Sequence, residues 1–198
     1  MSILAKITKN KPTKLISILV TLSVLQGCAA VAVVAITTGA SMATDRRSIG
    51  NQIDDQSIQV EAYNEIAKNK ALSDNTNFHL TSVNGSVLIV GQAPSANYRD
   101  QAIKIIHEIK GVVRVHNQIR IGTPTSVTTQ TNDIWLTSKV KTALFSSQKI
   151  NGKDIKVITE NGEVFLMGLV SKNEADAAVN VTRNISGVNK VFKAFEYL

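Results

Sequence analysis

Few side chains in this sequence have the types and spacing that catalysis or metal binding would require. The histidines, His79, His107 and His116, have no second histidine, cysteine or carboxylate pair at ligand spacing, so the sequence predicts no metal site. Asp54 and Asp55 are expected at a helix N-terminus, where they complement the helix dipole and have no acid–base role. No glycine-rich phosphate loop occurs. We therefore expect neither an enzyme nor a bound cofactor.

The one cysteine, Cys28, occupies a position that implies a covalent modification. Residues 1–14 hold four lysines and no acid, and residues 15–25 form an apolar run. The run ends in the tetrapeptide Leu25-Gln-Gly-Cys28. This is the layout of a secretory signal. The final tetrapeptide resembles the bacterial lipobox, in which the thiol is acylated and the chain is cut before the cysteine. We expect a signal peptide at 1–27 and lipid chains on Cys28.

A transmembrane helix is the alternative for this segment. Apolar residues resume after Cys28, so residues 15–36 are long enough to cross a bilayer. The sole cysteine at the lipobox position favours the lipoprotein, which two or more acyl chains would anchor stably. Ala29 is not the aspartate that commonly retains lipoproteins in the inner membrane, so the outer membrane is expected. Residues 28–53 would then be the acylated cysteine and its tether.

The charge of the chain argues against a nucleic-acid partner. The formal net charge is +7, but four lysines precede Cys28. The remaining chain holds 18 basic and 15 acidic residues, a balance of +3. Nucleic-acid-binding domains usually carry a dense basic stripe, which so small an excess does not supply.

Two copies of one unit follow the tether. The segment 84–91 (NGSVLIVG) recurs at 161–168 (NGEVFLMG), and Gly-Val-x-x-Val at 111–115 recurs at 187–191. The offsets of 77 and 76 residues indicate a duplication. We expect domains at 54–122 and 132–198, joined by a polar, proline-containing linker at 123–131.

Each copy predicts the same element order. In the second copy, Leu136, Val140 and Leu144 form the apolar stripe of a helix that Asp133 can cap. Asn161-Gly162 is typical of a type I′ turn between two strands, and Ser171–Glu174 has the capping-box pattern. A second helix ending near Gly187 and a last strand complete the order αββαβ. The predicted class is α+β, with a three-stranded sheet covered on one face by two helices.

These strand pairs and the Gly-Val-x-x-Val ending resemble the BON domain. With two such copies behind a lipobox, the chain resembles the dual-BON lipoproteins of Gram-negative bacteria. The resemblance implies an outer-membrane protein on the periplasmic side that supports envelope integrity and gathers at the division site. It also implies that the second domain binds anionic phospholipid, of the phosphatidylglycerol or cardiolipin type, mainly through its first helix.

The family's lipid-contacting positions transfer to Thr128, Trp135, Val140 and Phe145. Thr128 stands where the family has a glycine in a loop, and Val140 also belongs to the predicted core stripe. Trp135 and Phe145 lie off that stripe, and with Lys139 and Lys141 they have the composition of an interfacial membrane surface.

The first copy differs at the matching positions. They are Ser57 for Trp135, Glu61 for Lys139, Tyr63 for Lys141 and Ala67 for Phe145. The lipid-facing surface is therefore expected in the second copy alone. Two alternatives stay open: Trp135 and Phe145 could pack against the first copy, and the protein could instead dock on outer-membrane assembly machinery.

Overall fold

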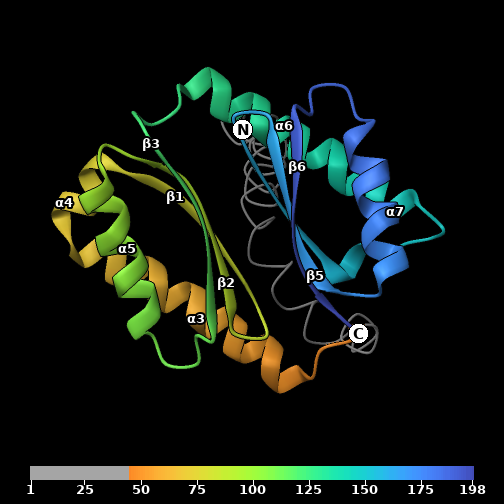
Figure 1. Cartoon of the computed structure of the whole chain (residues 1–198), viewed down its shortest axis with the longest axis horizontal. Coiled ribbons are helices and arrows are strands. Elements are labelled where there is room, and N and C mark those ends of the chain that lie inside the picture. The colour runs from red at the N-terminus through yellow and green to blue at the C-terminus, as the bar shows by residue number, and fades with distance from the viewer. Residues whose placement is uncertain (1–44) are drawn as a thin grey trace, which may run out of the picture. The chain divides into compact units, whose positions relative to one another are not determined.

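The computed structural model describes residues 45–198, which form one compact unit (Figure 1). The expected signal peptide, Cys28 and the tether as far as residue 44 lie outside the described residues. Within 45–198, no helix is both long enough and apolar enough to cross a bilayer.

The predicted order αββαβ is confirmed in both copies. Domain 1 has a further short helix, α4, and domain 2 has a single 3₁₀ turn, η2, neither of which the sequence pattern predicts. The elements of domain 1 are α3 (Ile49–Lys68), α4 (Lys70–Asn75), β1 (Asn77–Val83), β2 (Ser86–Ala93), α5 (Ala96–Glu108) and β3 (Arg114–Ile121). Those of domain 2 are α6 (Val127–Ser146), η2 (Gly152–Asp154), β4 (Ile155–Glu160), β5 (Glu163–Val170), α7 (Lys172–Arg183) and β6 (Lys190–Tyr197).

The two sheets have the same topology. Their strand orders are β1-β2-β3 and β4-β5-β6. The first pair of each sheet is antiparallel and is joined by the expected two-residue turn, in which Asn84, Gly85, Asn161 and Gly162 all have positive φ. The second pair is parallel, because the helix between the strands returns the chain to the same end of the sheet.

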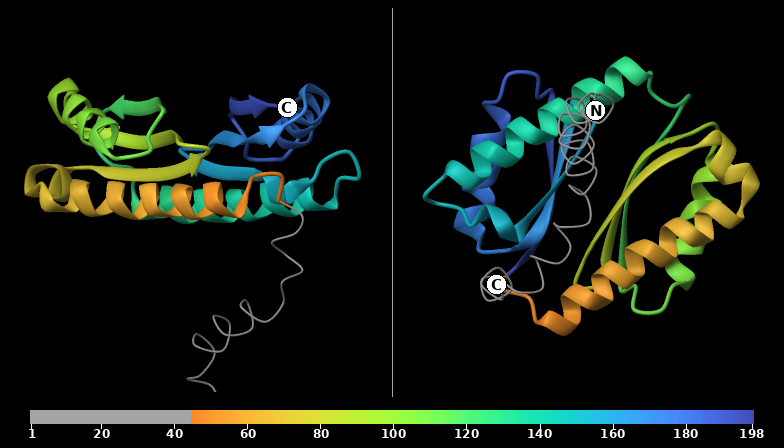
Figure 2. Two further views of the ribbon diagram at one scale, coloured as in Figure 1. Left: turned by 90° about the horizontal axis from the view of Figure 1, so that it is seen from below. Right: turned by 180° about the vertical axis from the view of Figure 1, so that it is seen from behind.

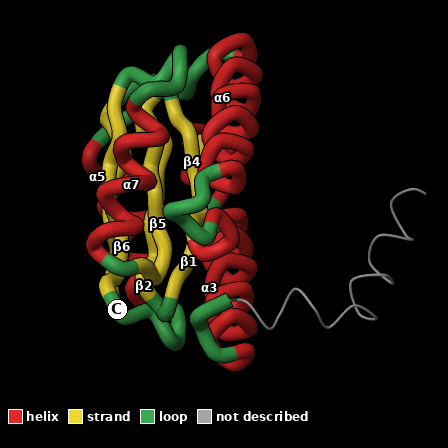
Figure 3. The backbone as a smooth tube through the Cα atoms, turned by 90° about the vertical axis from the view of Figure 1, so that its right-hand side faces the viewer, coloured by secondary structure: helices red, strands yellow, loops and turns green. Residues whose placement is uncertain are grey.

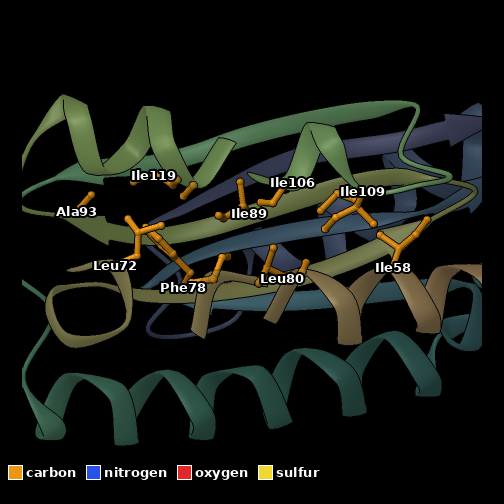
Figure 4. Packing of buried hydrophobic residues seen from close by; sticks show 13 residues of the cluster. Ile58, Leu72, Phe78, Leu80, Ile89, Ala93, Ile106, Ile109 and Ile119 are labelled. Carbon is orange, nitrogen blue, oxygen red and sulfur yellow. The ribbon is translucent and has the colours of Figure 1, made fainter. Parts of the chain in front are cut away.

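Each domain has its own core between one face of the sheet and its helices. Figure 4 shows the core of domain 1, where Ile58 of α3 and Ile106 of α5 pack on Leu80 and Ile89 of the sheet. In domain 2 the predicted helix stripe of Leu136, Val140 and Leu144 is buried at the equivalent place.

The opposite faces of the two sheets pack against each other. Val83, Leu88 and Val90 of domain 1 form one buried cluster with Phe165 and Met167 of domain 2. The sheets therefore lie back to back at the centre of the molecule, with helices outside (Figure 1). The two domains share a core and are a single sandwich, not separate modules on a linker.

The first helix of each domain begins earlier than the sequence predicts. Ser48 caps α3, accepting a hydrogen bond from Asn51 N at 3.0 Å, and Ser126 caps α6, accepting one from Thr129 N at 3.2 Å. The polar residues at 127–131 lack apolar periodicity, so the sequence pattern assigns them to the linker, but in the structure they form the start of α6. At its other end, α7 stops at Arg183, so Gly187 lies in the following turn and is not the helix cap.

The segment before α3 joins the two domains. The Arg46 guanidinium donates to both carboxylate oxygens of Glu174 on α7, each at 2.6 Å, and lies 3.2 Å from Asp154 of η2. The next residue, Arg47, donates to Asp55 of α3 at 2.7 Å. Two successive arginines thus pair with carboxylates of different domains.

The two long helices lie on the same side of the molecule. Figure 2 (left) shows α3 and α6 in one layer, with α5 and α7 in the layer beyond the sheets, and Figure 3 shows the same arrangement from another direction. The outer faces of α3 and α6 are therefore presented together, on the side away from α5 and α7.

Candidate membrane-binding site

The outer face of α6 carries exposed aromatic side chains. Trp135 is 62% exposed and Phe145 is 58% exposed, although both are large apolar side chains that folding would normally bury. Val127 and Ile134 on the same helix are also exposed. Residues of these types at a helix surface are typical of a binding face.

Lys139 lies against the exposed tryptophan. Its ammonium group is 4.1 Å from the centroid of the Trp135 ring, which is a cation–π contact. Lys141 is exposed on the other flank of the helix, facing the groove between α6 and α3. Neither lysine forms a salt bridge within residues 45–198, so both charges are available to an anionic partner.

The domain interface does not use the aromatic residues of α6. The cluster between the domains comes from strands, with Phe165, Met167 and Phe192 on the domain 2 side. Phe165 stacks on Phe192 with ring centroids 4.7 Å apart. Trp135 and Phe145 belong to no buried cluster of the described residues, so the alternative that they fill the interface is wrong for this structure.

Two residues transferred from the family lie in other environments than expected. Val140 is completely buried in the domain 2 core, because it faces the sheet together with Leu136 and Leu144. It can support the shape of the site but does not lie on its surface. Thr128 is exposed, but it is in the first turn of α6 and not in a loop.

A buried carboxylate fixes α6 against its sheet. Asp133, expected to cap the helix, lies inside α6, where its two oxygens accept hydrogen bonds from Asn161 N at 2.8 Å and Gly162 N at 2.9 Å. In domain 1, Asp55 accepts hydrogen bonds from Asn84 N and Gly85 N in the same way. The expectation that Asp54 and Asp55 lie at a helix N-terminus is wrong, because α3 begins at Ile49. Both carboxylates hold positive-φ turns against the first helix.

The first helix of domain 1 has a different surface. Ser57 and Ala67 stand at the places of Trp135 and Phe145, and the acidic Glu61 at the place of Lys139. However, α3 also exposes Ile49, Ile53 and Val60, which a comparison restricted to the positions matched to the aromatic residues and lysines of α6 does not reveal.

The candidate chemical residues are not brought together. Within residues 45–198, no group of three or more potential metal ligands occurs. His79 lies 3.6 Å from the buried Glu160 at the domain interface, and His107 is exposed on α5. His116 lies on β3, where partial burial lowers its pKa.

Comparison with known proteins agrees with the duplicated fold. The BON domain model matches residues 54–123 and 132–198. The chain is 37% identical over 188 residues to the outer membrane lipoprotein DolP of Haemophilus influenzae, covering 94% of this chain and 97% of that protein. It is also 37% identical over 154 residues to a 21 kDa hemolysin of Actinobacillus pleuropneumoniae, covering 78% of this chain and 79% of that one. The osmotically inducible protein Y of Escherichia coli is 26% identical over 161 residues, 77% of each chain.

Proposed function

The chain belongs to the BON-domain family of outer-membrane lipoproteins, and we propose that it binds anionic phospholipid through the outer face of α6. The single observation that carries the proposal is the contact of Lys139 with the exposed Trp135, on a helix whose counterpart in domain 1 has Glu61 and Ser57 instead. The two copies share their cores and differ on this face, which supports a function of the α6 face that domain 1 does not share.

The physical chemistry of the α6 face suits the interfacial region of a bilayer. Trp135 and Phe145 can enter the region between headgroups and acyl chains, where amphipathic aromatic rings are favoured. Lys139 and Lys141 can pair with phosphates, and each lysine near an anionic surface contributes about 1 kcal/mol. This gives weak and salt-sensitive binding.

The expected acyl chains on Cys28 would make such weak binding effective. A tethered chain meets the bilayer at a high local concentration, so a second contact of low affinity is still populated. In this proposal the protein lies on the periplasmic face, and α6 selects the part of the membrane that is rich in anionic lipid. Enrichment at the division site and a contribution to envelope integrity belong to the same proposal.

The experiment uses Trp135 as its own probe, because it is the only tryptophan in the chain. The full acylated protein is reconstituted into vesicles of zwitterionic lipid, with or without an anionic phospholipid, and quenching of its fluorescence by brominated acyl chains is measured. We expect strong quenching only with anionic lipid. Equal quenching in both vesicles, or none in either, would exclude the proposed α6 site.

A matched pair of charge reversals isolates the site. Lys139→Glu should abolish the quenching, whereas Lys104→Glu should leave it unchanged. Lys104 is an exposed lysine on α5, in the layer opposite α6, so the two variants change the net charge equally.

A second candidate function rests on α3. Ile49, Ile53 and Val60 are exposed on its outer face beside the carboxylates Asp54 and Glu61. An acidic, apolar helix face is poorly suited to an anionic bilayer but can bind a basic protein segment, as outer-membrane assembly machinery could present. If Trp135 is not quenched in any vesicle, this becomes the favoured function.

A further inference from the structure

The outer faces of α3 and α6 hold most of the exposed apolar side chains of the described chain. Within residues 45–198, twelve large apolar side chains are exposed, and eight of them lie on these two helices. They are Ile49, Ile53, Val60 and Tyr63 on α3, and Val127, Ile134, Trp135 and Phe145 on α6. We call this surface the two-helix face, because both helices present it on the same side of the molecule (Figure 2, left). A contiguous apolar surface is typical of a protein interface.

The two helices carry opposite charges that are not paired within the molecule. Two carboxylates of α3, Asp54 and Glu61, and two lysines of α6, Lys139 and Lys141, form no salt bridge within residues 45–198. The other two charged groups at the surface of α3 pair with each other. The two-helix face is therefore complementary in charge to the same face of a second molecule, provided that α3 of one meets α6 of the other.

A twofold axis brings the two molecules together in that way. The helices α3 and α6 run side by side in opposite directions and nearly level with each other (Figure 2, right). An axis in the plane of the face, between the helices and along them, places α3 of one molecule on α6 of its partner and α6 on α3. Both complementary contacts then form at once, in a closed dimer.

The register of this contact follows from the helix lengths. Both helices have 20 residues, and α3 of one molecule is antiparallel to α6 of the other. When their centres coincide, Asp54 of one molecule lies opposite Lys141 of the other, and Val60 lies opposite Trp135. An acid thus meets a base, and an exposed apolar residue meets the exposed indole.

The surface of α3 is hollowed where the bulky side chains of α6 would enter. The hollow measures about 680 Å³, and its lining includes Ser57, Val60 and Ala67. Ser57 and Ala67 stand at the places of Trp135 and Phe145 in the duplication. Small residues on one helix and large ones on the other let the two surfaces fit in shape as well as in charge.

We propose that the two-helix face binds a second molecule of this protein, in a twofold dimer in which α3 of each protomer packs on α6 of its partner. Two helices about 30 Å long and about 10 Å wide offer about 600 Å² on each protomer, against about 800 Å² in a standard interface. The dimer is therefore weak, and it forms where the expected acyl chains concentrate the protein on a membrane. It does not depend on lipid binding, but it covers Trp135, so anionic lipid and a second protomer compete for α6.

The test joins two protomers through single cysteines on the two-helix face. Ser57→Cys on α3 and Ser138→Cys on α6 replace exposed serines that lie opposite each other in this register. The two full acylated variants are mixed in zwitterionic vesicles and oxidised, and the expected acylation of Cys28 leaves the introduced cysteine as the free thiol. We expect the disulfide between the two variants to exceed either disulfide within one variant by about tenfold, because only the opposed thiols have a high effective concentration. A statistical mixture, or no disulfide in any vesicle, would overturn the dimer and leave α3 to a basic segment of another protein.

Charge changes on the same two variants test the complementarity. Glu61→Lys in the Ser57→Cys protomer places like charges together and should reduce the mixed disulfide about tenfold. Adding Lys139→Glu to the Ser138→Cys protomer should restore it. The control is Glu108→Lys, an equal change of charge at an exposed position of α5, which should have no effect. An equal loss with Glu61→Lys and Glu108→Lys would overturn the proposal.

Anionic lipid separates the dimer from the proposed function. Phosphatidylglycerol at a mole fraction that quenches Trp135 should reduce the mixed disulfide, because both ligands need the outer face of α6. A disulfide that persists while Trp135 is quenched would overturn the dimer. A mixed disulfide in vesicles whose anionic lipid never quenches Trp135 would support the dimer and reject the proposed lipid binding.

Discussion

Arg46 and Glu174 form a bidentate ion pair across 128 residues of sequence, with both nitrogen–oxygen distances at 2.6 Å. The pair connects the segment before α3 with the helix α7 of the other domain. Arg46 also compensates Asp154, whose side chain is only 3% exposed.

We predict that Arg46→Ala destabilises both domains together. The change leaves the carboxylate of Asp154 buried without its cation, which typically costs about 3–5 kcal/mol. Chemical denaturation should show one transition at lower denaturant concentration. The control is Arg99→Ala, because Arg99 pairs with its neighbour Asp100 and with neither Glu174 nor Asp154. An equal loss in both variants would contradict the prediction.

The same pair predicts a specific acid sensitivity. The hydrogen bonds from Arg46 lower the pKa of Glu174 from 4.5 to about 2. A carboxylate with a lowered pKa stabilises the fold above its ordinary pKa, and that contribution is lost as the pH falls through the folded value. Stability should therefore fall between pH 4.5 and pH 2. In Glu174→Gln the fall over this window should be shallower, which denaturation at a series of pH values would measure.

The turn carboxylates predict a further loss of stability. Asp133→Ala leaves the part-buried N–H groups of Asn161 and Gly162 without their acceptor, at a cost of about 1 kcal/mol for each lost hydrogen bond. Asp55→Ala should cost more, since Asp55 also accepts from Ser82 at 2.7 Å and pairs with Arg47. Thermal unfolding of the two variants would test this order. An Asp55→Ala variant that is more stable than the Asp133→Ala variant would contradict this order.

The shared core predicts that the domains do not unfold separately. Phe165 is 2% exposed in the cluster between the sheets, and Phe165→Ala should cost about 3–5 kcal/mol. Probes in the two domains should report the same midpoint in the native protein and in the variant. Two separated transitions in the native protein would show that the sheet–sheet contact does not couple the domains.

For the exposed aromatic residues of α6 we predict a loss of lipid binding without a loss of stability. Trp135→Glu should abolish binding of anionic vesicles, measured by sedimentation, with little change in melting temperature, because Trp135 is 62% exposed and belongs to no core cluster of residues 45–198. Phe165→Ala, assayed at a low temperature at which it is folded, is the control that should lower the melting temperature. A large fall in the melting temperature of Trp135→Glu, with binding intact, would contradict the proposed site.

Much of the fold could be predicted from periodicity and turn chemistry. The stripe of Leu136, Val140 and Leu144, the Asn161-Gly162 turn and the capping box at Ser171 are confirmed. The starts of α3 and α6 were missed, because their first turns are polar and their serine caps carry no apolar signal. The sheet–sheet contact has a signal in the sequence as well, because the unbroken apolar runs of β2 and β5 indicate strands buried on both faces.

Less of the candidate site could be predicted. Trp135, Phe145 and Lys139 stood out because the two copies differ there. The pocket beside Trp135 could not be predicted, since Asn132, Asn161 and Ser186, which line it, come from three separate segments of the chain. The burial of Val140 agrees with its place on the apolar stripe of the helix and not with its assignment as a lipid-contacting position.

The adjacent arginines also determine how the folded protein would respond to mechanical force. Tension along the chain from residue 44 would reach Arg46 and Arg47 first, and these residues pair with domain 2 and domain 1 respectively. The force would be divided between domain 1 and domain 2, so that neither domain would unfold progressively from one terminus. A protein held by one end and touching a surface elsewhere could then transmit strain as one rigid body.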